Sequence, residues 1–246
     1  MTTQTRPQGL SIIVPAYNEE RTICRVLCDL IALQPDFPME IIVLSDGSKD
    51  RTSEIVLEPR HIFNVRFVDN KVNQGKGNVV RQGIEMATNS HVLIFDADLE
   101  YFASDIPAMF KPIQMGLANV VFGSRNRGIN TMQPSFIFSL GRTVMTLYMN
   151  ILFGSAITDL HTCFKLIPVE YLLNGDLKEN GFGLDTEMTC LLLKNRVHPF
   201  EVPITYVGRT AAQGKKITKR DALICLKIIT VKRFKKSKGV EPHVSV

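Results

Sequence analysis

Three carboxylates at alternate positions are the residues whose spacing most strongly indicates chemistry. Asp96, Asp98 and Glu100 follow an apolar run within LIFDADLEYF, residues 93–102. Like charges this close repel one another, and a bound cation relieves that repulsion. Oxygen ligands suit Mg²⁺ or Mn²⁺, and Mg²⁺ takes one or two protein carboxylates while water and substrate phosphates fill its other positions. The spacing therefore favours a metal–diphosphate site over the alternative, a loop of exposed acids.

Basic residues that could hold phosphates come later in the chain. Arg125 follows the apolar run ANVVF in the triplet GSR, and its guanidinium offers a two-pronged donor to a phosphate. Arg209, Lys215 and Lys216 surround a glycine in RTAAQGKKI, residues 209–217, a loop that could close over a diphosphate. The sequence has no GxGxxG after its first apolar run and no GxxxxGK[ST], so a dinucleotide-binding fold or a P-loop is not supported.

The elements that must position these residues alternate between strand and helix. Apolar runs predict strands at residues 10–17, 40–48, 65–70 and 91–98, and helical spacing or glycine turns predict helices at 18–33, 48–57 and 75–88. This alternation implies an α/β fold with a mostly parallel, Rossmann-like sheet and helices on both faces. Asn18 is the expected N-cap of the first helix. Ligands bind at the carboxyl ends of such strands. Polar side chains gather at those ends: Tyr17, Glu19, Asp46, Asp96 and Asp98.

Length and composition fit one globular domain with an extension. The chain has 246 residues, 45% of them hydrophobic and 22% charged, which is enough for a full core. We expect a flexible N-terminus at residues 1–9, the main domain at 10–220 and a basic amphipathic extension at 221–246. The polar N-terminus lacks the apolar core of a signal peptide. The five cysteines have no CxxC spacing, so we expect a cytosolic protein with reduced thiols.

The net charge of +5 is concentrated in the C-terminal part of the chain. Residues 215–238 contain ten Lys or Arg and one Asp, so the remainder is net negative. Such a segment suits a membrane surface or a phosphorylated substrate, or is simply solvated. Nucleic acid is not expected, because Phe234 is the only aromatic residue within the basic run. The apolar run at 222–231, followed by KRFKKSK, is typical of an interfacial anchor with a polybasic flank.

Residues 136–157 form a long apolar segment, FIFSLGRTVMTLYMNILFGSAI. Its polar residues share one helical stripe, made of Ser139, Arg142, Thr143, Thr146 and Asn150. The opposite stripe is apolar and contains Ile137, Leu140, Val144, Leu147 and Ile151. This pattern predicts an amphipathic helix, whereas a membrane span needs roughly 20 mostly apolar residues. Two alternatives remain open at this point: the apolar face lies in a membrane interface, or it packs on the sheet.

Seven motifs together resemble one enzyme family. VPAYNEE, SDGSKDRT, NQGKGNVVRQG, DADLE, GSR, DLHTCFK and RTAAQGKKI occur in the order seen in family 2 glycosyltransferases of the GT-A fold. Over residues 9–230 the chain resembles the polyprenyl-phosphate sugar synthases, which include dolichyl-phosphate mannose synthases and glucosyltransferases. The resemblance implies an inverting, metal-dependent transfer of a hexose from a GDP-mannose or UDP-glucose type of donor to a polyprenyl phosphate. It also implies Mg²⁺ or Mn²⁺ as cofactor and a peripheral position on the cytoplasmic face of a membrane.

The resemblance also implies a role for individual residues. The nucleotide pocket would be lined by Pro15, Tyr17, Glu19, Leu44 and Asp46. The ribose and diphosphate would meet Asp96, Ala97 and Asp98, and the metal would be held by Asp98 and Glu100. Phosphate would be held by Arg125, Arg209 and one of Lys215 and Lys216. The acceptor would meet Arg142, Asp159, Thr162 and Lys165. Ser45 departs from the family's paired aspartates, and Glu100 stands where mannose synthases tend to carry Gln.

The acceptor decides whether the reaction needs a general base. In either case the metal on Asp98 and the charge of Arg125 would stabilise the departing diphosphate. A phosphate monoester has a second pKa of about 6, so it attacks as a dianion without a base. A hydroxyl needs a positioned carboxylate, and the candidates are Asp185 and Glu187 in FGLDTEMTCLLL. The same two acids could instead stabilise a helix N-terminus.

Two alternatives to the lipid-phosphate acceptor follow from this sequence. The first is a GT-A transferase that glycosylates a hydroxyl of a soluble small molecule or saccharide, with Asp185 or Glu187 as base. The second belongs to a different class: a non-catalytic module that binds a nucleotide sugar and recruits a partner. The complete set of acids and arginines favours an enzyme over the binding module. The sequence does not decide the sugar, the nucleotide or the oligomeric state.

Overall fold

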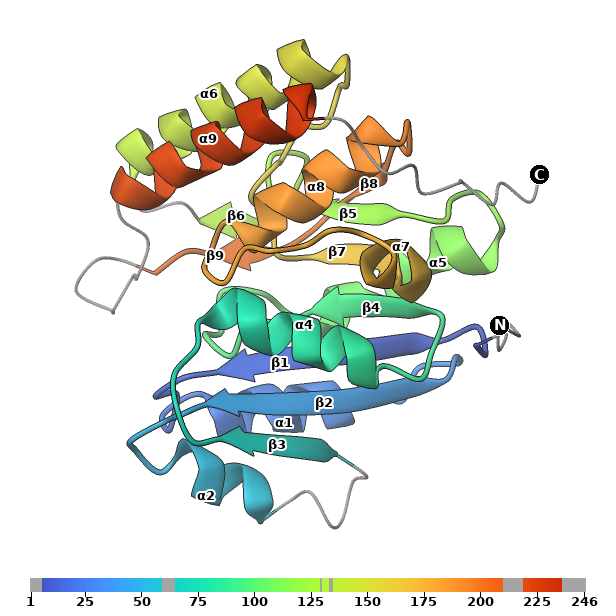
Figure 1. Ribbon diagram of the computed structural model, residues 1–246. Helices are drawn as coiled ribbons and strands as arrows, with labels where there is room; N and C mark the ends of the chain where they lie inside the picture. The colour runs from blue at the N-terminus through green and yellow to red at the C-terminus, as the bar shows by residue number, and fades with distance from the viewer. Residues whose placement is uncertain (1–5, 59–64, 129, 133–134, 210–218, 236–246) are drawn as a thin grey trace.

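The computed structural model describes residues 6–58, 65–128, 130–132, 135–209 and 219–235. Within them a seven-stranded sheet has the strand order β3-β2-β1-β4-β7-β5-β8, and β6 and β9 form a separate two-stranded pair (Figure 1). The strands of the large sheet are β1 (Leu10–Ala16), β2 (Met39–Asp46), β3 (Arg66–Asn70), β4 (His91–Ile94), β5 (Val121–Ser124), β7 (Lys165–Pro168) and β8 (Phe200–Pro203). The small pair consists of β6 (Thr131–Met132) and β9 (Tyr206–Val207).

Most pairs in the large sheet are parallel, as the sequence predicts. Parallel pairs join β1 to β2 and β4, β2 to β3, and β5 to β8, whereas β7 runs antiparallel to both β4 and β5. The carboxyl ends of the first four strands therefore meet at one edge. Three predicted strands agree with β1, β2 and β3 to within two residues. The fourth is shorter than predicted, because β4 ends at Ile94 and places Asp96 and Asp98 in the turn that follows.

Helices cover both faces of the sheet because alternate strand residues point to opposite sides. Ile12 and Val14 of β1 pack in a core cluster with α1 and α5, whereas Ile13 packs with α4 and α8 in another. The first face carries α1 (Ile23–Ile31), α2 (Thr52–Leu57), the short 3₁₀ helix η1 (Ala103–Asp105) and α5 (Ile106–Gln114). The second face carries α4 (Lys76–Met86), α7 (Val169–Leu173) and α8 (Leu184–Lys194).

The expected cap of the first helix is wrong. Helix α1 begins at Ile23 with Thr22 as its N-cap residue. Asn18 lies upstream with φ 55°, and its side-chain oxygen accepts the Lys49 N–H at 2.8 Å while its own N–H donates to Ser48 Oγ. Asn18 therefore joins the loop after β1 to the loop after β2, and the helix starts later than its apolar spacing indicated.

Two further helices form an outer layer over α8. Helices α6 (Phe136–Phe153) and α9 (Lys219–Phe234) lie side by side across it (Figure 1). Their shared core contains Met145, Met149, Cys190 and Ile229. The predicted boundary between 220 and 221 falls inside α9. Among the described residues, α6 is the one helix long and apolar enough to cross a membrane by length and composition.

Candidate active site

The three carboxylates of the DADLE motif meet two cations at the carboxyl edge of the sheet. Asp96 pairs with Lys76 Nζ at 2.7 Å, and Lys76 is the first residue of α4. Asp98 pairs with Arg209 Nη2 at 2.8 Å, and the Nε atom of Arg209 lies 3.5 Å from Glu100. Glu100 also accepts a hydrogen bond from the Arg209 N–H at 2.8 Å. The arrangement is a mixed-charge cluster in which each acid has a basic neighbour.

Crowding keeps one of these acids partly protonated near neutral pH. Burial, together with the neighbouring Asp96 and Glu100, raises the pKa of Asp98 to about 7, although Arg209 opposes the shift. Burial also acts against ionisation of Asp96, but the charge of Lys76, hydrogen bonds from Lys76 and Cys163, and the charge of Arg209 together lower the pKa of that carboxyl. The cluster therefore has one acid, Asp98, whose ionised form needs more positive charge than the protein supplies.

Lys76 is a site residue that the sequence interpretation missed. Its Nζ lies 3.9 Å from Asp185 Oδ2 and 3.5 Å from Cys163 Sγ, in addition to its pair with Asp96. The other oxygen of Asp185, Oδ1, is buried and has no hydrogen-bond partner within the described part of the chain. The signal in the sequence was the GKG triplet at 75–77, which is too short to identify a site by itself. Lys76 thus joins the DADLE carboxylates to an unsatisfied acceptor on α8.

The turn that carries Lys76 is fixed by Asp46. The two carboxylate oxygens of Asp46 accept the N–H groups of Gln74 at 2.8 Å and Gly75 at 2.9 Å. Gly75 has φ 94°, and a Cβ there would lie 2.4 Å from the carbonyl oxygen of Asn180, so only glycine fits. The side chain of Leu44, on the same strand as Asp46, is fully buried in the core. Contact of these two residues with a nucleotide base stays a prediction.

Arg125 and Asp159 form a buried ion pair. Arg125 is 5% exposed and Asp159 1%. The guanidinium donates two bonds to the carboxylate, at 2.7 and 2.8 Å, and the Arg125 N–H donates a third at 3.1 Å. The guanidinium carbon also lies 4.9 Å from the centre of the Tyr206 ring. Burial and the Arg125 charge lower the pKa of Arg142 on α6, so this arginine lies within electrostatic range of the pair. The geometry gives Arg125 a structural partner and does not favour a grip on substrate phosphate.

The other two acceptor candidates face the interior. The Lys165 ammonium is buried and donates to the carbonyl oxygens of Leu160 and Asp185, each at 2.9 Å. Thr162 is buried, and its hydroxyl oxygen accepts the Phe164 N–H at 3.2 Å. Both side chains satisfy backbone groups of the DLHTCFK loop and its neighbours. Of the four predicted acceptor residues, Arg142 is the one that is not fully buried.

The two base candidates on α8 lie in different surroundings. Glu187 is buried, and its Oε2 accepts the N–H groups of Lys178 and Glu179 at 2.8 and 2.9 Å. Its Oε1 pairs with Lys232 Nζ of α9 at 2.5 Å. Asp185, by contrast, lies beside Lys76 in the carboxylate cluster. We therefore keep Asp185 as the candidate base and regard Glu187 as structural.

For the remaining predicted residues the structure gives burial and position. Pro15, Tyr17 and Glu19 are partly buried at the carboxyl end of β1, and Ala97 is buried behind the DADLE turn. Lys215 and Lys216 lie outside the described residues. Tyr206 is a further residue that the sequence did not reveal; its hydroxyl donates to Glu100 Oε2 at 2.7 Å, although it comes 106 positions later.

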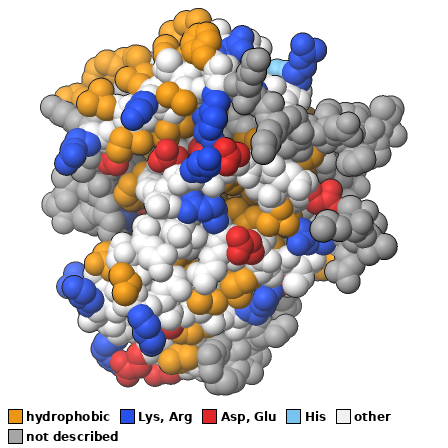
Figure 2. Space-filling view, in the orientation of Figure 1, with side chains coloured by type: hydrophobic (Ala, Val, Ile, Leu, Met, Phe, Trp, Pro, Cys, Tyr) orange, Lys and Arg blue, Asp and Glu red, His pale blue; other side chains and the backbone are white. Residues whose placement is uncertain are grey.

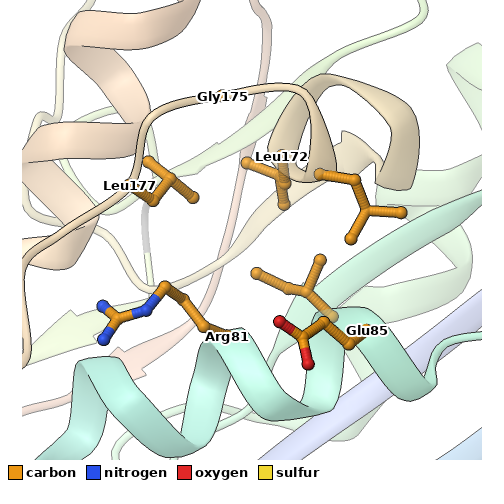
Figure 3. A pocket seen from close by; sticks show the side chains of 7 residues that line it. Arg81, Glu85, Leu172, Gly175 and Leu177 are labelled. Carbon is orange, nitrogen blue, oxygen red and sulfur yellow. The ribbon is translucent and has the colours of Figure 1, made fainter.

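A separate hollow of about 160 Å³ lies between α4 and α7 (Figure 3). Arg81 and Glu85 of α4 contribute its polar lining, opposite Leu172 and Gly175. It shares no lining residue with the carboxylate cluster. Among the described residues, no group of three or more His, Cys, Asp or Glu side chains is arranged to hold a metal ion.

The family match and the fold together define a nucleotide-sugar-dependent glycosyltransferase with the GT-A fold. The chain belongs to glycosyl transferase family 2, whose family model matches residues 11–172. This confirms the family, fold and enzyme class that the motifs indicated.

Three comparisons show the range of its relatives. It is 38% identical over 213 residues to the poly-β-1,6-N-acetyl-D-glucosamine synthase of Staphylococcus epidermidis, covering 82% of this chain but only 48% of that protein. It is 28% identical to the dolichyl-phosphate β-glucosyltransferase of Dictyostelium discoideum, covering 85% and 68%. The structure of glucosyl-3-phosphoglycerate synthase from Mycobacterium tuberculosis with phosphoglyceric acid superposes with a TM-score of 0.70 at 17% identity, covering 95% and 82%. The same synthase has been solved with UDP and Mn²⁺ or Mg²⁺.

Proposed function

We propose that this glycosyltransferase moves a hexose from a nucleotide-diphosphate sugar to a polyprenyl phosphate, with inversion at the anomeric carbon. The proposal of a nucleotide-diphosphate sugar as donor rests on the carboxylate cluster at the edge of the sheet. Arg209 holds Asp98 and Glu100 there and adds positive charge near the expected diphosphate. Lys215 and Lys216 would add further charge. We assign Arg125 to the support of this region through Asp159, because it is buried and two of its guanidinium N–H groups bind that carboxylate.

The residues present fit a divalent cation with few protein ligands. The physical sign is the raised pKa of Asp98, because a bound cation would favour the ionised form of this crowded carboxyl. Asp98 would be the ligand, and Glu100 would support it, since each of its oxygens already accepts a hydrogen bond. When bound, Mg²⁺ or Mn²⁺ would neutralise charge on the departing diphosphate. Relatives of the same fold have been solved with both ions.

The lipid-phosphate acceptor rests on one observation: helix α6 presents its apolar stripe outward and carries Arg142 within electrostatic range of the Arg125–Asp159 pair. A lipid phosphate reaching this end of the molecule would meet a guanidinium. Its dianion needs no base. The similarity to a dolichyl-phosphate glucosyltransferase over 85% of this chain supports the same acceptor class. A peripheral position on the cytoplasmic face of a membrane follows from this proposal.

A second candidate is favoured by Asp185. Its buried Oδ1 lacks a hydrogen-bond partner among the described residues and lies in the cluster with Lys76. An acceptor hydroxyl could donate to it, and Asp185 would then act as general base. In that case the acceptor would be a hydroxyl of a saccharide or small molecule.

One experiment separates these proposals. UDP- and GDP-sugars are offered with Mn²⁺ or Mg²⁺ to a polyprenyl phosphate and, in parallel, to soluble acceptors. Transfer to the lipid phosphate that persists in Asp185→Asn supports the first proposal. Transfer only to a hydroxyl, lost in Asp185→Asn, supports the second. Mn²⁺ binding, measured by electron paramagnetic resonance without any acceptor, should be lost in Asp98→Ala; unchanged Mn²⁺ affinity would contradict the metal assignment.

A further inference from the structure

The apolar stripe of α6 faces away from the protein. Ile137, Leu140, Val144, Leu147 and Ile151 recur every three or four residues and are all exposed, with Ile137 at 78% and Ile151 at 70%. The side that packs inward instead carries Met145, Thr146 and Met149. The Thr146 hydroxyl oxygen accepts the Leu160 N–H at 3.2 Å, and the Asn150 side chain bonds the backbone of Ile157. A helix of a soluble domain normally buries its apolar stripe, so this orientation is inverted.

Helix α9 adds a second exposed stripe, which contains both apolar and basic residues. Its exposed side contains Arg220, Leu223, Ile224, Lys227, Val231 and Phe234, again at helical spacing. The opposite side, with Cys225, Ile228 and Ile229, packs into the core shared with α6 and α8. The two helices are tied by the Tyr148 and Thr230 hydroxyls at 2.8 Å. Apolar side chains accordingly gather over this outer layer, with basic side chains among them, in the upper part of Figure 2. The outer side chains of α6 and α9 form one surface, here called the α6–α9 face.

The charge of this face selects its partner. The charged residues named on this face are Arg220 and Lys227 of α9, both exposed, and neither exposed stripe contains an acidic residue. Two copies of such a face would repel each other, which disfavours a homodimer. An anionic lipid surface has the complementary charge and also accepts apolar side chains. The Thr146 contact with Leu160 and the Tyr148 contact with Thr230 of α9 hold α6 on the protein body, so it would lie along a leaflet and not cross it.

We propose that the α6–α9 face docks the protein onto an anionic lipid bilayer, with Ile137, Leu147 and Ile151 in the acyl boundary and Arg220 and Lys227 at the headgroups. The role of this docking rests on the proposed function, because docking would bring α6, which carries Arg142, close to lipid-borne phosphate. The docking itself is independent of catalysis and can be measured without donor or acceptor.

The test uses the full chain and vesicles of phosphatidylcholine, with and without phosphatidylglycerol, in a flotation assay. The variants are Ile137→Glu, Ile151→Glu and Lys227→Glu. The matched control is Leu117→Glu, because Leu117 is 63% exposed but lies after α5. Since the substituted side chains are exposed, all variants should fold, which circular dichroism checks. Each isoleucine variant should bind anionic vesicles at least about tenfold more weakly, about 1.4 kcal/mol. Lys227→Glu should reduce the preference for anionic lipid, and Leu117→Glu should bind as the wild type does.

Three results would overturn the proposal. The wild type remains unbound on anionic vesicles; or Ile137→Glu and Ile151→Glu bind as tightly as the wild type; or the wild type is a dimer in solution that Ile137→Glu dissociates. Transfer assays distinguish this failure from that of the proposed function. Vesicle binding without transfer to a lipid phosphate would support the docking proposal and refute the lipid-phosphate acceptor. Transfer to detergent-dispersed lipid phosphate without vesicle binding would support the acceptor and refute the docking proposal.

Discussion

The buried Arg125–Asp159 pair gives the sharpest test of how the site is built. Replacing Asp159 by Asn keeps the side-chain volume and one hydrogen-bond acceptor but leaves the Arg125 charge uncompensated in the interior. Removing one partner of a buried pair costs about 3–5 kcal/mol. Because the amide still accepts one bond, we expect about 3 kcal/mol. This is a large share of a typical unfolding free energy of about 5–15 kcal/mol.

Urea unfolding followed by circular dichroism measures this loss. With a slope of about 2–3 kcal/mol/M, the midpoint should fall by about 1 M. The double variant Arg125→Met with Asp159→Leu replaces both charges by apolar side chains and should recover most of the stability, since well-packed apolar substitutes are often neutral. Calorimetric binding of UDP or GDP to the double variant should stay within about threefold of the wild type, because Arg125 is assigned to the scaffold.

The opposite pattern would refute the reasoning. If Asp159→Asn unfolds at the wild-type urea concentration while the double variant loses nucleotide-diphosphate affinity by about tenfold or more, Arg125 grips phosphate and its bond to Asp159 is incidental. The original sequence interpretation of Arg125 would then be the better one.

Three other predictions concern charge in the site and core. Lys76→Met removes the cation that lowers the pKa of Asp96, so the acidic limb of the pH–rate profile should move to higher pH and turnover should fall at least about tenfold; an unchanged profile would remove Lys76 from the site. Glu187→Gln should lower the unfolding free energy by about 1–2 kcal/mol and leave the Michaelis constant for the donor unchanged. Asp185→Asn should instead leave the unfolding free energy unchanged and lower turnover with a hydroxyl acceptor, as urea unfolding and steady-state kinetics can show. Burial lowers the pKa of His91 below 6.5, so the unfolded state takes up a proton first as the pH falls. Stability should therefore drop by about 1.4 kcal/mol for each pH unit between about 6.5 and the folded-state pKa; urea titrations at several pH values should show this slope, and His91→Gln should flatten it.

The fold was predictable because its sheet is buried on both faces. Continuous apolar runs such as LSIIV and EIIVL have no other stable location, and glycine and polar residues mark the strand ends. The carboxylate cluster was predictable for a related reason: Asp96, Asp98 and Glu100 are close in sequence and follow a strand whose carboxyl end must face the ligand edge. Even so, β4 ended earlier than predicted, since the last apolar residue, Phe95, packs in the core beyond the strand.

The partners of these acids were not predictable from sequence spacing. Lys76 reaches Asp96 from the helix after β3, and Arg209 reaches Asp98 across 111 positions. Similarly, Arg125 pairs with Asp159, 34 positions away, and the pair is buried. A sequence motif names residue types but not which cation will satisfy which acid. The direction of the α6 stripe also depends on tertiary contacts, because amphipathic spacing is the same whether the apolar side faces a core or a lipid.

Two acids on α8 show how one short motif can serve two sides of a helix. Residues two apart on an α-helix point about 200° away from each other, so Asp185 and Glu187 cannot share a task. Asp185 faces Lys76 and the carboxylate cluster, whereas Glu187 faces α9 and binds Lys232. Glu187 also holds the Lys178 and Glu179 N–H groups, and the carbonyl oxygen of the next residue, Asn180, accepts the N–H of Gly77 at 2.7 Å. Three consecutive residues of the loop between α7 and α8 thus bind Glu187, whose partner Lys232 lies on α9, and the turn that carries Lys76. Polar contacts therefore connect α9, one of the two helices of the α6–α9 face, to the turn beside the carboxylate cluster.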